Sequence, residues 1–132
     1  MSVCNGTVLV VEDAGPCATT LEIALARVAG LRVRVVSTVE DACAALADDA
    51  GVCAVVTDLH IGKESGLDLI RWMRRGGGRR LPIIVISGDS DPETPAASLR
   101  LGADAYFAKP FSPAEVRHKL EDLIHGDDSS PL

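Results

Sequence analysis

Acidic side chains stand at the ends of two apolar runs in this 132-residue chain. Glu12 and Asp13 follow the run Thr7–Val11, and Asp58 follows the run Val52–Thr57. Carboxylates gathered in one cleft repel each other at neutral pH unless a cation joins them. Oxygen ligands that leave room for several waters are those that Mg²⁺ prefers. These residue types therefore predict a magnesium site in which one carboxylate could act as a nucleophile.

Two further polar residues follow later apolar runs. Ser87 comes after Pro82–Ile86, and Lys109 comes shortly after Asp104–Phe107. A hydroxyl donor and a compact positive charge suit the oxygens of a phosphoryl group. Each residue also has a structural interpretation, with Ser87 in a turn and Lys109 as a solvated loop residue. Asp13, likewise, could simply cap the helix that follows it.

The elements that must position these residues alternate along the chain. Short β-branched runs predict five strands, which are Thr7–Val11, Leu31–Val36, Val52–Thr57, Pro82–Ile86 and Asp104–Phe107. Helical patterns follow each of them, at Pro16–Ala29, from Thr38 toward Gly51, from Ser65 to Arg75, at Pro92–Leu101 and from Pro113 after the cap Ser112. Strict alternation implies a parallel sheet with right-handed crossovers. In such sheets the chemistry gathers at the carboxyl ends of the strands, where all the polar residues above fall.

The composition is that of one soluble globular domain. Hydrophobic residues make up 47% and charged residues 24%, and the formal net charge is −6. That charge argues against direct nucleic-acid binding, which needs a clustered basic face. The one basic cluster is predicted to be a solvated helix end and loop; it comprises Arg71, Arg74, Arg75, Arg79 and Arg80.

No apolar run has the length of a membrane helix, and the first residues lack a charged-then-apolar signal pattern. We therefore expect no membrane association and a cytoplasmic location. The cysteines form no Cys-x-x-Cys pair and are expected to be small buried hydrophobes; they are Cys4, Cys17, Cys43 and Cys53. Residues 1–125 are predicted to form the domain, and Gly126–Leu132 a polar tail.

Taken in order, the motifs resemble those of the response-regulator receiver domains of two-component signalling, including the chemotaxis receivers. They are Val10-Val11-Glu12-Asp13, Thr57-Asp58, Ser65-Gly66, Ile86-Ser87-Gly88, and Gly102-Ala103-Asp104-Ala105-Tyr106 with Lys109-Pro110-Phe111. The resemblance covers nearly the whole chain, from Val8 to Ile124. It implies an α/β, flavodoxin-like (βα)5 fold of three layers, with a parallel five-stranded sheet in the order 2-1-3-4-5.

Carried over residue by residue, the resemblance makes Asp58 the phosphoacceptor. Glu12 and Asp13 would bind Mg²⁺, with Glu12 acting directly or through water. Asp58 and the backbone carbonyl of His60 would complete the protein ligands. The partner that supplies the phosphoryl group would be a sensor histidine kinase or a histidine phosphotransfer protein.

The resemblance also assigns the residues that read the phosphoryl group. Ser87 would bind one of its oxygens and Lys109 would pair with the phosphorylated carboxylate, across a Lys109-Pro110 bond that the family favours as cis. Ser87 and Tyr106 would form the switch couple, although Tyr106 could instead be static packing. The surface made by the fourth helix, the fifth strand and the fifth helix would signal to a downstream protein or fused output domain, or pair two copies as a homodimer.

Three positions near the acceptor vary within the family. Gly62 stands where many relatives have proline, which predicts a looser loop after Asp58. His60 and Asp89 would line the site and could tune how readily water attacks the acyl phosphate.

Three alternative functions would each require different residues. An aspartyl-phosphate phosphatase would carry a second acid two residues after the nucleophile, where this chain has His60. A dinucleotide or flavin binder would need a glycine-rich turn where this chain has the acidic Glu12–Pro16 segment. A phosphorylation-independent adaptor would not need an intact acidic site. The chain could be a stand-alone receiver or a receiver excised from a longer regulator or hybrid kinase.

Overall fold

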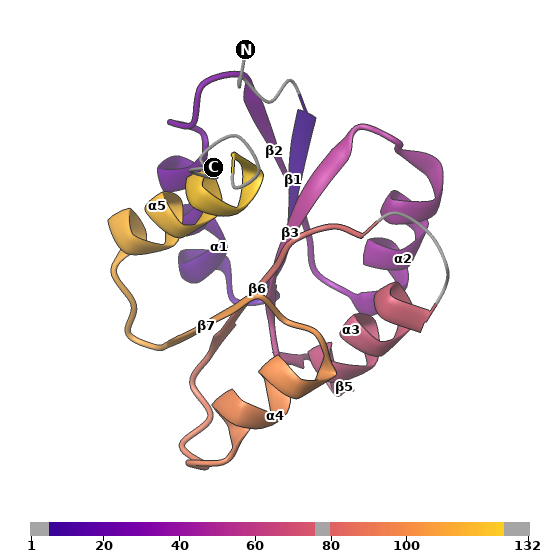
Figure 1. Ribbon diagram of the computed structural model, residues 1–132, viewed down its shortest axis with the longest axis vertical. Helices are drawn as coiled ribbons and strands as arrows, with labels where there is room; N and C mark the ends of the chain where they lie inside the picture. Colours follow the sequence, from indigo (N-terminus) through magenta and orange to yellow (C-terminus); the bar gives the residue numbers. More distant parts are fainter. Residues whose placement is uncertain (1–5, 76–79, 126–132) are drawn as a thin grey trace, which may run out of the picture.

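The computed structural model describes residues 6–75 and 80–125. Figure 1 shows one sheet, seen nearly edge-on, with helices on both sides of it. Its five strands pair in parallel in the order β2-β1-β3-β6-β7. Their bounds are β1 (Gly6–Val11), β2 (Leu31–Val36), β3 (Val52–Asp58), β6 (Ile83–Ser87) and β7 (Ala105–Ala108). Counting these five strands along the chain gives the order 2-1-3-4-5, so the predicted topology is confirmed.

Helices cover both faces of the sheet (Figure 1). On one face lie α1 (Gly15–Leu25) and α5 (Pro113–Ile124). On the other lie α2 (Val39–Asp48), α3 (Gly66–Arg75) and α4 (Thr94–Leu101). These three layers are the predicted flavodoxin-like arrangement. No helix within the described ranges has the length and apolar character to cross a membrane.

The sheet separates two hydrophobic cores because successive side chains of a strand point to opposite faces. In β1, Val8 and Val10 pack with α1 and α5, whereas Leu9 and Val11 pack with α2 and α3. All four are fully buried, as expected of a central parallel strand covered by helices on both faces. β2 is an edge strand with exposed arginines, also as predicted.

Three of the predicted helix starts carry side-chain caps, whereas α1 and α4 begin without one. Thr38 Oγ1 accepts a hydrogen bond from Asp41 N at 3.0 Å, and Ser112 Oγ accepts one from Glu115 N at 3.2 Å. Ser65 Oγ accepts from Leu67 N at 3.1 Å in the same way. The end of α1 was predicted too late: the helix stops at Leu25, and shorter-range backbone bonds continue the chain to Val28.

A small antiparallel hairpin was not predicted. It joins β4 (His60–Ile61) to β5 (Glu64–Ser65) in the connection between β3 and α3. Strands of two residues have no recognisable hydrophobic periodicity, so the residue pattern predicts only a polar loop here. The side chain of Ile61 is buried in the core shared with α2 and α3.

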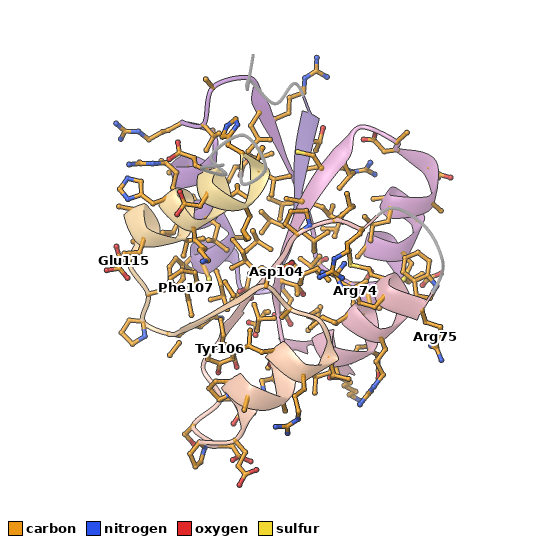
Figure 2. All side chains as sticks on the ribbon, viewed as in Figure 1. Arg74, Arg75, Asp104, Tyr106, Phe107 and Glu115 are labelled. Atoms are coloured by element: carbon orange, nitrogen blue, oxygen red, sulfur yellow. The ribbon has the colours of Figure 1, made fainter. Side chains whose placement is uncertain are left out.

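The prediction that the whole basic cluster is solvated was wrong for Arg74. Its guanidinium is largely buried and donates to the carbonyls of Gly102 and Leu81 and to the carboxylate of Asp104. Figure 2 shows Arg74 lying beside Asp104, whereas Arg75 of the same helix points away from the fold. Helical geometry sends neighbouring residues in different directions, and a run of arginines does not reveal which one turns inward. Three of the predictions lie outside the described residues; they concern Arg79, Cys4 and the tail 126–132.

Candidate functional site

The register of the sheet brings the polar residues together. Val11 pairs with Thr57, so the next residues along β1 and β3, Glu12 and Asp58, are neighbours at the carboxyl edge. Asp58 pairs with Ile86, the residue before Ser87. The residue that follows β7, Lys109, donates its backbone N–H to the Ser87 carbonyl at 2.8 Å.

Lys109 joins the two buried carboxylates of this edge. Its Nζ lies 2.7 Å from Asp58 Oδ2 and 3.1 Å from Glu12 Oε1. The exposed fraction of the side chain is 7% for Asp58, 1% for Glu12 and 27% for Lys109. Buried charges need such partners, because an isolated ion in a low-dielectric interior is very unfavourable. The predicted convergence of these three side chains is therefore present in the structure.

The protonation of Lys109 follows from these contacts. Burial alone would lower the pKa of Lys109, since it disfavours the charged form. Hydrogen bonds and charge attraction from Asp58 and Glu12 outweigh that burial and raise the pKa above its ordinary value. Lys109 is therefore a firmly held cation beside the Asp58 carboxylate. The Lys109-Pro110 peptide bond that follows is cis, as the resemblance implied.

The backbone also fixes the Asp58 carboxylate. His60 N donates to Asp58 Oδ1 at 3.1 Å, while Thr57 Oγ1 donates to the Asp58 carbonyl at 2.8 Å. The start of α3 packs so closely against this turn that a Cβ on Gly66 would overlap the Asp58 carbonyl oxygen. Gly66, a motif residue of the sequence, is thus required for this approach.

Asp13 is exposed and does not cap α1. Its Oδ2 accepts a hydrogen bond from Gly62 N at 2.7 Å, which links the end of β1 to the β4–β5 hairpin. Near the start of α1 the accepting side chain is Glu12 instead, because Glu12 Oε2 accepts a hydrogen bond from Ala14 N at 3.0 Å. The interpretation of Asp13 as a simple helix cap is therefore not supported.

Cys17, in the first turn of α1, lies close to this acidic group. Burial is the main cause that raises the pKa of Cys17 to about 12, and the neighbouring Glu12 carboxylate adds to it. The thiol is therefore protonated at neutral pH. The prediction that the cysteines are buried was too strong, because Cys17, Cys43 and Cys53 are only partly buried. Cys17 and Lys109 also line an open hollow of about 270 Å³.

Ser87 is fully buried and its hydroxyl is turned toward the next loop. Ser87 Oγ accepts from Asp89 N at 3.0 Å. Asp89 Oδ2 in turn lies 3.4 Å from Nε2 of the exposed His60. The backbone N–H of Asp91 is the main cause that lowers the pKa of the Asp89 carboxyl, and His60 adds to it. His60 and Asp89 thus connect the loops that follow β3 and β6.

Tyr106 lies on β7, the strand that pairs with β6, and β6 ends in Ser87. It is half-buried on β7 and packs against the core shared with α2 and α3, opposite Phe107 on the other face of the sheet. Figure 2 shows Tyr106 on the α4 side and Phe107 on the α5 side.

The carboxylates suit a divalent cation by their chemistry. Glu12, Asp13 and Asp58 carry three negative charges, and Lys109 balances one of them. The remaining charge and the all-oxygen donors are those that Mg²⁺ takes. Within residues 6–75 and 80–125, no group of three or more His, Cys, Asp or Glu side chains is arranged to hold a metal ion. Lys109 contacts both Glu12 and Asp58, and Asp13 contacts Gly62 N.

Sequence reasoning missed two contributors to the site. Gly62 predicts only a looser loop, although its N–H donates to Asp13 Oδ2. No sequence signal marks the hairpin residue Glu64, whose Oε1 accepts a hydrogen bond from Val39 N at 3.1 Å, at the start of α2. The available signal was a glycine in the middle of a polar loop, which often marks a positive φ.

Comparison with known proteins gives one consistent result. The family model described as "Response regulator receiver domain" matches residues 8–121. The transcriptional regulatory protein GltR of Pseudomonas aeruginosa is 36% identical over 127 residues, which are 94% of this chain and 51% of that protein. The two-component response regulator PprB of the same organism is 30% identical over 89% of this chain and 43% of that protein. The chain thus spans about half the length of these curated relatives.

Solved structures share the fold. A putative response regulator from Chloroflexus aurantiacus superimposes with a TM-score of 0.81 at 28% identity, over 90% of this chain and 97% of that one. A Francisella response-regulator receiver domain gives a TM-score of 0.83 at 23% identity, over 93% and 99% of the two chains. The chain belongs to the response-regulator receiver-domain family of two-component signalling.

Proposed function

We propose that Asp58 is the phosphoacceptor of this receiver domain. The observation that carries the proposal is the buried Asp58 carboxylate, held at 2.7 Å by the Lys109 ammonium at the carboxyl edge of the sheet. An Asp58 oxygen attacks the phosphorus of a phosphohistidine, forming an O–P bond. The P–N bond breaks, and the imidazole leaves with the electron pair and takes up a proton.

The residues proposed to hold Mg²⁺ are Glu12, Asp13, Asp58 and the backbone carbonyl of His60. When bound, the ion would neutralise the charge of the phosphoryl oxygens during transfer. Glu12 also holds Lys109, which keeps the ammonium beside Asp58.

Ser87 and Lys109 are the proposed readers of the phosphoryl group. Lys109 already contacts Asp58 and would pair with an oxygen of the phosphoryl group carried there. Ser87 Oγ accepts from Asp89 N, and the Ser87 O–H would donate to a phosphoryl oxygen when one is present. A new charge cluster of this kind can bias a bistable element.

Tyr106 would then relay the state of Ser87 to the surface of α4, β7 and α5. Val85, which pairs with Tyr106, lies two residues before Ser87 on β6. The proposed partners are a sensor histidine kinase or histidine phosphotransfer protein as donor, and a downstream protein, a fused output domain or a second copy as receiver of the signal. The cytoplasmic location stays a prediction.

The test is incubation with acetyl phosphate and Mg²⁺, followed by intact-mass measurement. The expected result is one added phosphoryl group, stable in acid and labile in base. Asp58→Asn and removal of divalent metal with a chelator should each abolish it. Labelling of Asp58→Asn to the wild-type level, or labelling without metal, would contradict the assignment and favour an adaptor or a different chemistry.

A further inference from the structure

The outer face of α3 carries an exposed tryptophan between arginines. The exposed residues of this helix are Asp68, Arg71, Trp72 and Arg75. They are spaced three or four positions apart, so their side chains lie next to one another on the helix surface. Trp72 is 41% exposed, although folding usually buries most of a tryptophan side chain. These four residues are called the α3 outer face below.

The exposed arginines of this face contribute little to the fold. Arg71 Nη1 donates to Asp68 Oδ1 at 2.8 Å, and the two side chains are 51% and 69% exposed. Ion pairs this exposed add little to stability. In the part of the chain that the structure describes, Arg75 has no ion pair. Arg74 turns inward instead and ties α3 to the neighbouring segments. The outward guanidinium groups are therefore available to a partner.

The α3 outer face lies apart from the phosphoacceptor and from α5. The first residue of α3, Gly66, packs against the Asp58 carbonyl, whereas Arg71 and Arg75 belong to the last turns of the helix. Figure 2 shows Arg75 on the side of the molecule opposite Glu115 of α5. A partner bound to the α3 outer face therefore does not need to touch Asp58 or α5.

The residue types of this face suit carboxylates next to an apolar side chain. Tryptophan and arginine are the residues that most often dominate binding energy in protein interfaces. A guanidinium pairs with a carboxylate through two parallel hydrogen bonds, and the indole ring offers an apolar contact. Asp68 already places one carboxylate on Arg71 within the chain.

We propose that the α3 outer face binds an acidic segment of a partner protein, with carboxylates on Arg71 and Arg75 and an apolar side chain on Trp72. A nucleic acid fits less well. The net charge of −6 repels a polyanion as a whole, and duplex binding commonly uses roughly 6–10 phosphate contacts, more than this face can make.

Trp72 is the single tryptophan of the chain, so its fluorescence reports on this face directly. A glutamate-rich synthetic peptide should change its emission saturably and more weakly at high salt, and the glutamine counterpart should not. Arg75→Glu should raise the dissociation constant about ten-fold. Asp68→Ala should lower it, because Arg71 loses its internal carboxylate. Arg34→Glu, at an exposed arginine of β2, makes the same charge change and should leave the affinity unchanged.

Several results would overturn the inference. One is the absence of a saturable change in Trp72 emission with the acidic peptide, and another is an equal loss of affinity in Arg34→Glu and Arg75→Glu. Tighter binding of a single-stranded oligonucleotide of the same charge would favour a nucleic acid instead. A dimer in sedimentation velocity that Arg75→Glu dissociates would favour a second copy of the chain. Asp58→Asn should bind the peptide like wild type, so failure here is distinguishable from failure of the proposed function.

Discussion

At the level of single residues, Lys109 has two roles. It compensates two buried carboxylates in the folded chain, and it is placed to pair with a phosphoryl oxygen. Because the pKa of Lys109 is raised in the folded state, the stability linked to its titration is fully present below the ordinary lysine pKa, wherever its carboxylate partners are ionised. That contribution is lost as the pH rises through the raised pKa of the folded state. At neutral pH the pairs are therefore fully formed.

Lys109→Ala should lower the free energy of unfolding at pH 7 without Mg²⁺ by about 1–3 kcal/mol, since Glu12 and Asp58 would remain buried and uncompensated. Urea unfolding measures the difference. Arg27→Ala, which removes an exposed positive charge in the turn after α1, should change stability by less than about 0.5 kcal/mol. Equal stabilities of Lys109→Ala and wild type would show that the bridge has no net structural effect.

Cys17 gives a second prediction at this scale. Because its pKa is raised to about 12, almost none of the thiol is ionised at pH 8, and the thiolate is the reactive form. In a chain with the other three cysteines changed to serine, alkylation by iodoacetamide at pH 8 should be much slower than in the same chain unfolded in urea. Cys17 is only partly buried and lines an open hollow. Equal alkylation rates in the folded and the unfolded chain would contradict the raised pKa of Cys17.

The single residues of the site were largely predictable, and their hydrogen bonds were not. Glu12, Asp58 and Lys109 could be identified because a parallel sheet collects the carboxyl ends of its strands at one edge. The Asp13–Gly62 bond joins distant residues through a backbone N–H, which every residue but proline carries, so no side-chain pattern signals it.

At the level of elements, Arg74 ties α3 to the segments around β6 and β7. It donates to the carbonyls of Gly102 and Leu81, and to Asp104, whose Oδ2 also accepts from Ile83 N at 2.8 Å. Burial is the main cause that lowers the pKa of Arg74, and Asp104 opposes it. Figure 2 shows this contact in the interior, well apart from the outward Arg75.

Arg74→Ala should lower the free energy of unfolding by about 2–3 kcal/mol, because several carbonyls and Asp104 lose a charged donor. Arg75→Ala in the same helix should change it by less than about 0.5 kcal/mol. Thermal and urea unfolding of both variants provide the measurement. An equal loss of unfolding free energy in both variants would mean that the buried contacts of Arg74 contribute no more to stability than the exposed Arg75 does.

The elements themselves were predicted well where they are long and periodic. The five long strands and five helices lie where the alternation placed them, with ends shifted by a few residues. The hairpin could not be predicted, because two-residue strands are defined by backbone pairing and by Ile61, a single buried side chain. The inward turn of Arg74 depends on tertiary packing, which a run of arginines in the sequence leaves open.

At the level of the whole molecule, magnesium binding should couple to folding. A ligand that binds only the folded chain stabilises it by about 1.4 kcal/mol at a concentration ten times its Kd. Mg²⁺ at that concentration should therefore raise the unfolding free energy of wild type by this amount, at matched ionic strength. The single tryptophan, the half-exposed Trp72 of α3, can report the transition. The effect should disappear in Asp13→Ala; an equal effect in both chains would argue for a site elsewhere.

One carboxylate of this molecule, that of Asp58, is proposed to receive the phosphoryl group. Tandem mass spectrometry of peptides from protein treated with acetyl phosphate and Mg²⁺, mapped before the label hydrolyses, tests this most directly. The expected result is a single modified residue, Asp58. A label on Asp13, Glu12, Ser87 or His60 in place of Asp58 would contradict it.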